Sequence, residues 1–313
     1  MSIAHYILGI LLAPLLLGII NRVKAKFAGR HGRPYFQLYY DLAKLARKSA
    51  VYSTTASPIF WIGPLVTLAS VLAALLFVPL GGAPSLVHFT GDFLLVAYLL
   101  AMGRFATILA ALDTGSAFEG MGASREAVYS ALAEPVLLLA FVPLGITVKT
   151  FSLSAMLTPF TPEAWDKYWP VFILLGVAFF IVLLTENCRI PVDDPNTHLE
   201  LTMIHEVMIL DHGGVDLAVI EFASSLKLWF FCAVVAGAAL PDLTLFAAGT
   251  PIYGELFSGP AVALLLSLCG IFLVAVLVGV TESVMARMKL LKLPALLTLA
   301  GALTALACLF CLR

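Results

Sequence analysis

The chain has 313 residues, of which 61% are hydrophobic and 12% are charged, and its mean hydropathy is +1.03. A water-soluble domain could not bury so much apolar surface. The 18 basic residues nearly balance the 19 acidic residues, so no overall field favours nucleic acid as a partner. The composition therefore predicts an integral membrane protein in contact with the lipid bilayer.

Membrane-spanning helices need roughly 20 mainly apolar residues each. About eight such runs occur, near residues 3–20, 58–80, 92–112, 128–148, 169–185, 217–240, 260–281 and 294–312. The first run lacks a basic segment before it and an A-x-A cleavage site, so we interpret it as a span and not as a signal peptide. The loops are too short for a second folded domain, and we expect one all-α transmembrane domain over residues 1–313.

Basic residues are distributed unevenly between the predicted loops. Thirteen fall in loops on one side of the membrane: Arg22, Lys24, Lys26, Arg30, Arg33, Lys44, Arg47, Lys48, Arg125, Arg189, Arg287, Lys289 and Lys292. Only Lys149, Lys167 and Arg313 fall on the other side. Because cytoplasmic loops are enriched in Lys and Arg, the larger set is predicted to be cytoplasmic and both termini to lie outside.

The loop between the first two spans contains a helical pattern of apolar residues. In residues 34–48, Phe36, Leu38, Tyr39, Leu42 and Leu45 recur at helical spacing beside a basic end. This pattern predicts an amphipathic helix on the cytoplasmic membrane surface. It could anchor the chain to lipid, dock a partner, or do both.

Ionisable side chains occur within or at the ends of the spans, where burial is costly and a function is the default hypothesis. Glu221 and Lys227 are six residues apart, so they point in different directions on one helix and need partners elsewhere. Buried carboxylates and a lysine can exchange protons near neutral pH. We therefore assign a proton pathway to six residues, namely Arg104, Asp113, Glu134, Glu186, Glu221 and Lys227. Static ion pairs are the alternative, most plausibly for Asp113 at a helix end.

A polar segment, residues 186–216, follows the fifth span and is predicted to form a cytoplasmic loop. We interpret it, together with Arg125, as a docking and coupling surface, whose candidate residues are Arg189, Asp193, Asp194, Glu200, His205 and Glu206. His198, His205 and His212 recur every seven residues, but neither HExxH nor Glu-x-x-His spacing is present. The five cysteines are scattered among apolar runs. We therefore predict no metal and no redox cofactor in this chain.

Several motifs resemble one family of membrane subunits. Glu186-x-x-Arg189-x-Pro191-x-Asp193 resembles the E-x-x-R-x-P-F-D motif of subunit 1 of respiratory NADH–quinone oxidoreductase (complex I) and of its counterpart in energy-converting hydrogenases. The run LDTGSAFEGMGASREAVYSALAEP, residues 112–135, is closer to formate hydrogenlyase and hydrogenase-4 type complexes. Further support comes from SLK at 225–227, E-x-x-M-A-R at 282–287 and the amphipathic YYDLAKL. The resemblance covers nearly the whole chain.

The resemblance implies an eight-helix subunit of a prokaryotic cytoplasmic membrane complex, with no catalytic residues of its own. It would join a cytoplasmic redox arm of iron–sulfur and [NiFe]-hydrogenase-like subunits, whose clusters are the only cofactors implied, to antiporter-like pumping subunits. Glu134 and Glu186 match glutamates of the family's proton path, Lys227 matches a lysine of its hydrogenase branch, and Arg125, Arg189 and Asp193 match positions near the redox arm.

The sequence departs from the family where quinone enzymes carry F-D-L-P-E-A-E. Here the stretch reads VDDPNTH, so Asn196 and His198 replace two acidic residues. This favours a hydrogenase-type complex over the alternative of a quinone-binding subunit. A secondary transporter is a second alternative, although no inverted repeat is evident. A purely structural anchor is a third.

Overall fold

The structure is a computed structural model and describes residues 2–54, 56–158, 162–194, 203–240 and 259–312. Most of the described residues are helical, with no β-strand among them beyond one isolated bridge between Leu80 and Ala83. The chain is thus an all-α protein, as its sequence predicts.

Eight of the described helices are long and apolar enough to cross a membrane. They are α1 (Ser2–Phe27), α3 (Pro58–Leu75), α4 (Asp92–Asp113), α5 (Ala117–Val148), α7 (Pro162–Glu186), α9 (Gly214–Ala239), α12 (Pro260–Val284) and α13 (Leu293–Cys311). Shorter elements connect them: α2 (Gln37–Leu45), α6 (Leu153–Met156), α8 (His205–Met208) and a 3₁₀ turn, η1 (Leu290–Lys292). The expected eight spans and an additional short helix after the first span are confirmed.

Two helix boundaries differ from the prediction in an informative way. The helix predicted at 128–148 begins at Ala117. The hydropathy pattern missed its first turns because they contain the charged residues Glu119 and Glu126, which are buried inside the protein. The span predicted at 58–80 ends at Leu75. Its start is fixed by Ser57, whose side chain accepts a hydrogen bond from the Ile59 N–H at 3.3 Å, with Pro58 in the first turn.

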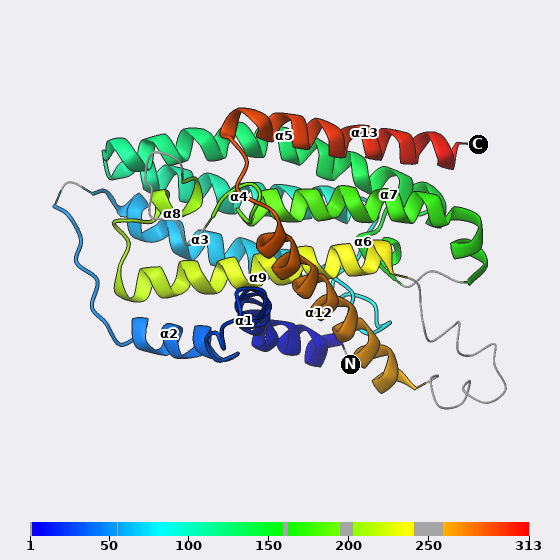
Figure 1. Cartoon of the computed structure of the whole chain (residues 1–313), viewed down its shortest axis with the longest axis horizontal. Coiled ribbons are helices and arrows are strands. Elements are labelled where there is room, and N and C mark those ends of the chain that lie inside the picture. The colour runs from blue at the N-terminus through cyan, green and yellow to red at the C-terminus, as the bar shows by residue number, and fades with distance from the viewer. Residues whose placement is uncertain (1, 55, 159–161, 195–202, 241–258, 313) are drawn as a thin grey trace.

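Helix α9 occupies the centre of the bundle and contacts α1, α2, α3, α7 and α12. Helix α13 packs along α5 and α7, and α12 crosses obliquely over α1 (Figure 1). Large aromatic side chains fill the middle of the bundle, including the fully buried Phe141, Phe172, Phe179, Phe230 and Phe231. This packing fixes the positions of α4, α5, α7 and α9 relative to one another.

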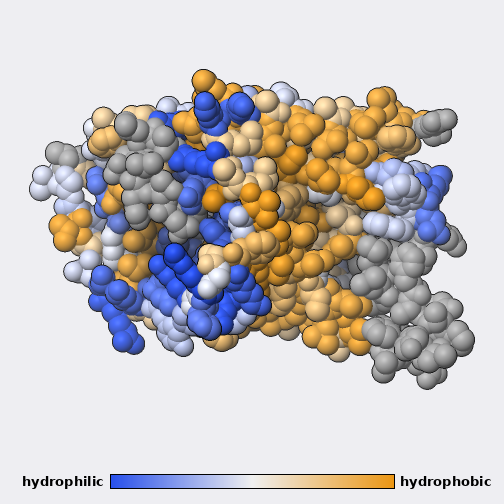
Figure 2. Space-filling model, viewed as in Figure 1, coloured by the Kyte–Doolittle hydropathy of each residue, from blue (hydrophilic) through white to orange (hydrophobic). Residues whose placement is uncertain are grey.

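The two ends of the bundle differ in polarity. One end, here named the α2 end, carries α2 and α8, and the opposite α6 end carries α6 and the C-terminus of α13 (Figure 1). Figure 2 shows hydrophilic side chains gathered towards the α2 end and a hydrophobic surface over the middle of the bundle. An apolar belt of this kind is what a multi-pass membrane protein presents to lipid.

Candidate functional site: a buried ion network and its entrance cavity

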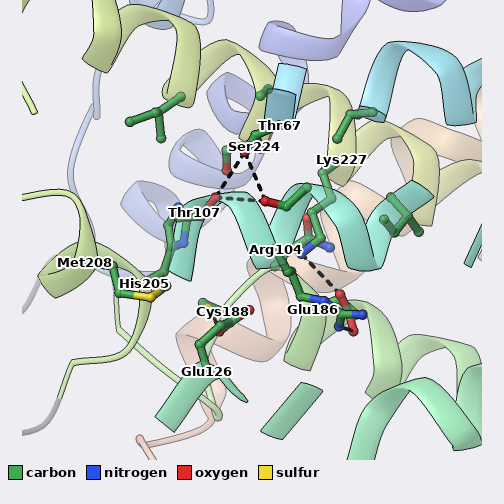
Figure 3. A pocket seen from close by; sticks show the side chains of 16 residues that line it. Thr67, Arg104, Thr107, Glu126, Glu186, Cys188, His205, Met208, Ser224 and Lys227 are labelled. Atoms are coloured by element: carbon green, nitrogen blue, oxygen red, sulfur yellow. Dashed lines mark hydrogen bonds and ion pairs between the residues drawn. The ribbon is translucent and has the colours of Figure 1, made fainter. Parts of the chain in front are cut away.

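Three charged side chains from three spans meet inside the bundle. The Arg104 guanidinium on α4 donates a hydrogen bond to Glu186 Oε1 at the end of α7. Lys227 Nζ on α9 lies 3.1 Å from the other carboxylate oxygen, Glu186 Oε2. Figure 3 shows these side chains directed towards one another. The Glu186 side chain is only 2% exposed, so its charge is neutralised by two cations instead of water.

Glu134 is the fourth member of this network, but it is less buried than the sequence suggests. Its Oε2 lies 3.4 Å from Arg104 Nη2, and its side chain is 25% exposed on the flank of α5. Helix rotation decides this exposure, and a single sequence does not specify the rotation of α5 against its neighbours. Arg104 therefore connects an enclosed carboxylate, Glu186, to one that reaches the lateral surface of the bundle.

Glu126 belongs to the same site and was not selected from the sequence. It is buried on α5, and Cys188 Sγ lies 3.7 Å from its Oε2. The available sequence signal was the seven-residue spacing of Glu119 and Glu126, which places both on one face of a helix that includes them. The apolar run used to place the span began after this face.

A small cavity of about 50 Å³ lies among these groups, lined by Arg104, Glu126, Glu186, His205 and Lys227 together with less polar neighbours. A volume of this size accommodates only a few water molecules. Carboxylates, an ammonium group and water in contact form the arrangement through which protons can pass between side chains.

A larger cavity of about 340 Å³ continues from the small one towards the α2 end. Both are lined by Asn187, Cys188, His205, Ile220 and Ser224, so they adjoin. The larger one, here named the entrance cavity, runs between α1, α2 and α9, and its ionisable lining is Arg33, Asp41, Arg189, Asp193, His205, Glu206 and Glu221. Glu221 thus faces this cavity, whereas Lys227 on the same helix faces Glu186.

Two neighbouring residues of α8 in the entrance cavity have perturbed acidity. Burial, followed by the nearby charge of Glu221, raises the pKa of Glu206 to about 7. Burial, followed by the charges of Lys227 and Arg189, lowers the pKa of His205 to about 4. At neutral pH His205 is therefore uncharged, and Glu206 is poised between its two protonation states.

Ion pairs and hydrogen bonds tie the polar segment to the bundle. Asp193 accepts a hydrogen bond from the Ile204 N–H at 2.7 Å and pairs with Arg287 at 2.9 Å. Burial is the main cause that raises the Asp193 pKa, although these bonds oppose it. Arg125 donates to the Met203 carbonyl at 2.8 Å. These contacts fix the chain on both sides of residues 195–202.

Glu282 at the end of α12 anchors the other side of this segment. Its fully buried carboxylate lies 2.7 Å from Lys24 Nζ and 3.6 Å from Arg189 Nη1. Arg189 therefore both lines the entrance cavity and forms an ion pair with Glu282 at the end of α12.

Of the remaining predicted site residues, Asp113 lies apart from the ion network, Asp194 adjoins Asp193, and Glu200 is not described. Asp113 accepts a hydrogen bond from the Ser57 N–H at 2.6 Å, and it lies nine residues, about 13 Å along α4, from Arg104. The Asp194 N–H donates to Asp193 Oδ1 at 2.9 Å. Glu200, like Asn196 and His198, lies outside the described residues.

Among the residues that the structure describes, no three His, Cys, Asp or Glu side chains form a group that could hold a metal ion. His205 and His212 do not share a helix, because α8 ends at Met208. The His212 ring instead stacks on Phe60 with 4.0 Å between ring centroids.

Comparison with known protein families assigns the chain. A family model described as NADH dehydrogenase matches residues 1–312. The chain belongs to this family. The chain with its eight candidate spans is therefore a membrane subunit of the hydrogenase-type or complex I-like class.

Relatives within the family include hydrogenase subunits. The chain is 28% identical to hydrogenase-4 component C of Escherichia coli over 99% of this chain and 94% of that protein. It is 26% identical to formate hydrogenlyase subunit 4 of the same species over 89% and 87% of the two chains. NADH-ubiquinone oxidoreductase chain 1 of Mycosarcoma maydis is 26% identical over 68% of this chain and 67% of that protein.

A solved structure shares the fold. A chain from the membrane-bound sulfane sulfur reductase, an archaeal respiratory membrane complex, superposes with a TM-score of 0.80 at 20% identity and covers 99% of this chain and 98% of that one. This match shows the fold, and the family model and the hydrogenase relatives confirm the resemblance predicted from the sequence motifs.

Proposed function

We propose that this chain is the membrane anchor and proton-coupling subunit of an energy-converting, hydrogenase-type complex in a prokaryotic cytoplasmic membrane. The α2 end faces the cytoplasm in this proposal, because the loops there carry most of the basic residues. The partners would be iron–sulfur and [NiFe]-type subunits at that end and antiporter-like subunits in the membrane. The redox centres would belong to these partners.

One observation carries the proposal, namely the adjoining cavities that connect Glu206 at the α2 end with Glu186 inside the bundle. Glu206 exchanges its proton near neutral pH. A change of charge in a docked redox arm would alter the proton occupancy of the entrance cavity. Arg104 links Glu186 with Glu134, which reaches the flank where a neighbouring membrane subunit can contact it.

The first test is purification of the chain from its native membrane in mild detergent, with metal analysis of everything that co-purifies. We expect a large subunit of hydrogenase type, iron–sulfur proteins and antiporter-like subunits, with iron and nickel or iron alone. Recovery of the chain alone as a metal-free homo-oligomer would contradict the proposal and favour a secondary transporter.

The second test changes Glu134→Gln in the assembled complex reconstituted into liposomes. We expect the number of ions moved per electron transferred to fall to background while the complex stays assembled. Asp92→Asn is the matched control, because Asp92 is a buried carboxylate at the far end of α4 that binds the Ser152 hydroxyl at 3.0 Å. A wild-type ratio for Glu134→Gln would remove that residue from the pathway.

Quinone binding remains the second candidate function, and the size of the entrance cavity favours it. About 340 Å³ lies within the range of small-molecule sites, and α2 lies beside it. Competitive inhibition of turnover by a quinone analogue, relieved by Glu221→Gln or Arg33→Gln, would support it. Turnover insensitive to such analogues would exclude it.

A further inference from the structure

A basic groove lies beside the entrance cavity, on the surface of the α2 end. It has a volume of about 600 Å³ and runs between the C-terminal turns of α1, the loop that follows, and the end of α12. Lys24, Arg30 and Arg33 contribute its basic lining, and Phe27 and Ser283 contribute to its walls.

The loop is folded back onto α1, which brings these side chains together. Arg22 donates a hydrogen bond to the His31 carbonyl and lies over the Tyr35 ring, 5.5 Å from its centroid. Gly32 has a φ of +68°, and a Cβ there would come within 2.5 Å of the Ala25 methyl group. These contacts within residues 22–35 hold the loop against the last turns of α1 and so form one wall of the groove.

The groove has an excess of positive charge. No acidic residue occurs before Asp41, whereas five basic residues lie between positions 22 and 33. The one carboxylate in the lining, Glu282, is fully buried and is already paired with both Lys24 and Arg189. Arg30 and Arg33 are exposed, so their charge is available to a ligand.

The position of the groove relative to the membrane indicates which kind of anion it binds. The groove lies where the candidate spans of α1 and α12 both end, at Phe27 and Val284. Phe27 is 58% exposed, and the outer face of α12 continues with exposed Leu273, Leu277 and Val284. Figure 2 shows hydrophilic side chains at the end of α1 beside the hydrophobic surface of α12.

We propose that this groove binds an anionic phospholipid, with its phosphate beside Arg30 and Arg33 and its acyl chains along the exposed face of α12. Basic pockets between spans near the cytoplasmic surface suit such headgroups. Neither a free phosphate nor an acidic protein segment would use the exposed apolar surface that continues from the groove. The bound lipid would fill the junction of α1, α12 and the loop before α2.

The test measures lipid binding to the full chain, purified in mild detergent and delipidated, by native mass spectrometry. The probes are phosphatidylglycerol, cardiolipin and phosphatidylcholine. We expect the anionic lipids to bind at least tenfold more tightly than phosphatidylcholine, and the variant R30Q/R33Q to lose this preference. The control R47Q/K48Q removes the same charge from exposed positions outside the groove and keeps the preference.

Other results would overturn the proposal. Equal lipid preference in R30Q/R33Q and R47Q/K48Q would place the binding elsewhere, and full competition by millimolar inorganic phosphate would identify a phosphate site. Binding of a decaglutamate peptide without binding of anionic lipid would identify an acidic protein segment as the occupant. Arg33 also lines the entrance cavity, so Arg30→Gln alone is the second variant if R30Q/R33Q unfolds.

Discussion

Glu186→Gln is the perturbation whose energetic effect follows most directly from the structure. The wild-type carboxylate is 2% exposed and neutralises Arg104 and Lys227, whose side chains are 9% and 17% exposed. Glutamine keeps the shape but leaves two enclosed cations without their shared partner. Removing one side of a buried ion pair typically costs about 3–5 kcal/mol, so we expect a loss of that order in the free energy of unfolding.

The assay is unfolding of the detergent-solubilised chain by increasing sodium dodecyl sulfate, followed by tryptophan fluorescence. Lys227→Met serves as the matched comparison, because Glu186 then retains Arg104 as a partner. It should cost less than Glu186→Gln. The double variant should be about 1–3 kcal/mol more stable than the sum of the two single losses predicts, because it removes both members of one contact.

Two results would refute this reasoning. Strict additivity of Glu186→Gln and Lys227→Met would mean that the 3.1 Å contact contributes no coupling energy. A loss for Glu186→Gln of only a few tenths of a kcal/mol would mean that water, and not the two cations, solvates this carboxylate.

Two further predictions concern other carboxylates. Because the Glu206 pKa is raised from 4.5 to about 7, its stabilising contribution is complete below pH 4.5 and is lost as the pH rises to about 7, since only the folded state binds the proton in that range. Thermal unfolding should show wild-type stability falling between pH 4.5 and 7 and levelling off above that. An equal fall in Glu206→Gln would contradict this. Asp113→Ala should lower the free energy of unfolding by about 1 kcal/mol, because the Ser57 N–H loses its hydrogen-bond acceptor. The number of ions moved per electron in liposomes should stay unchanged. Loss of ion movement in this variant would show that Asp113 belongs to the proton pathway.

Hydropathy was sufficient to place the spans because the bilayer imposes their length and apolar character. It was less accurate where protein and not lipid surrounds a helix. The first turns of α5 contain Glu119, whose carboxylate accepts a hydrogen bond from the Asp211 N–H at 3.1 Å. This bond gives a buried carboxylate a partner in the part of α5 that precedes the predicted start at 128 by up to eleven residues.

In the ion network too, the sequence identified individual charged residues but not their contacts. Arg104, Glu186 and Lys227 were all selected from the sequence because charges are rare in spans. Their pairing was not predictable, since Glu186 follows Arg104 by 82 residues. Glu126 was overlooked because nothing in a hydropathy profile marks a buried carboxylate in a polar stretch. Glu134 was expected to be enclosed, and its partial exposure depends on how α5 is rotated.

The sequence by itself therefore determined the membrane class, the number of spans and the family, because each depends on local composition or on motifs in order. Tertiary structure decided which charged groups contact one another. Lys227 forms an ion pair with Glu186, Glu221 lines the entrance cavity, and Asp113 accepts a hydrogen bond from the Ser57 N–H. The physical reason is that a charge in an apolar bundle must be neutralised by a group within a few ångströms. Only the packing of the helices brings those groups within that distance.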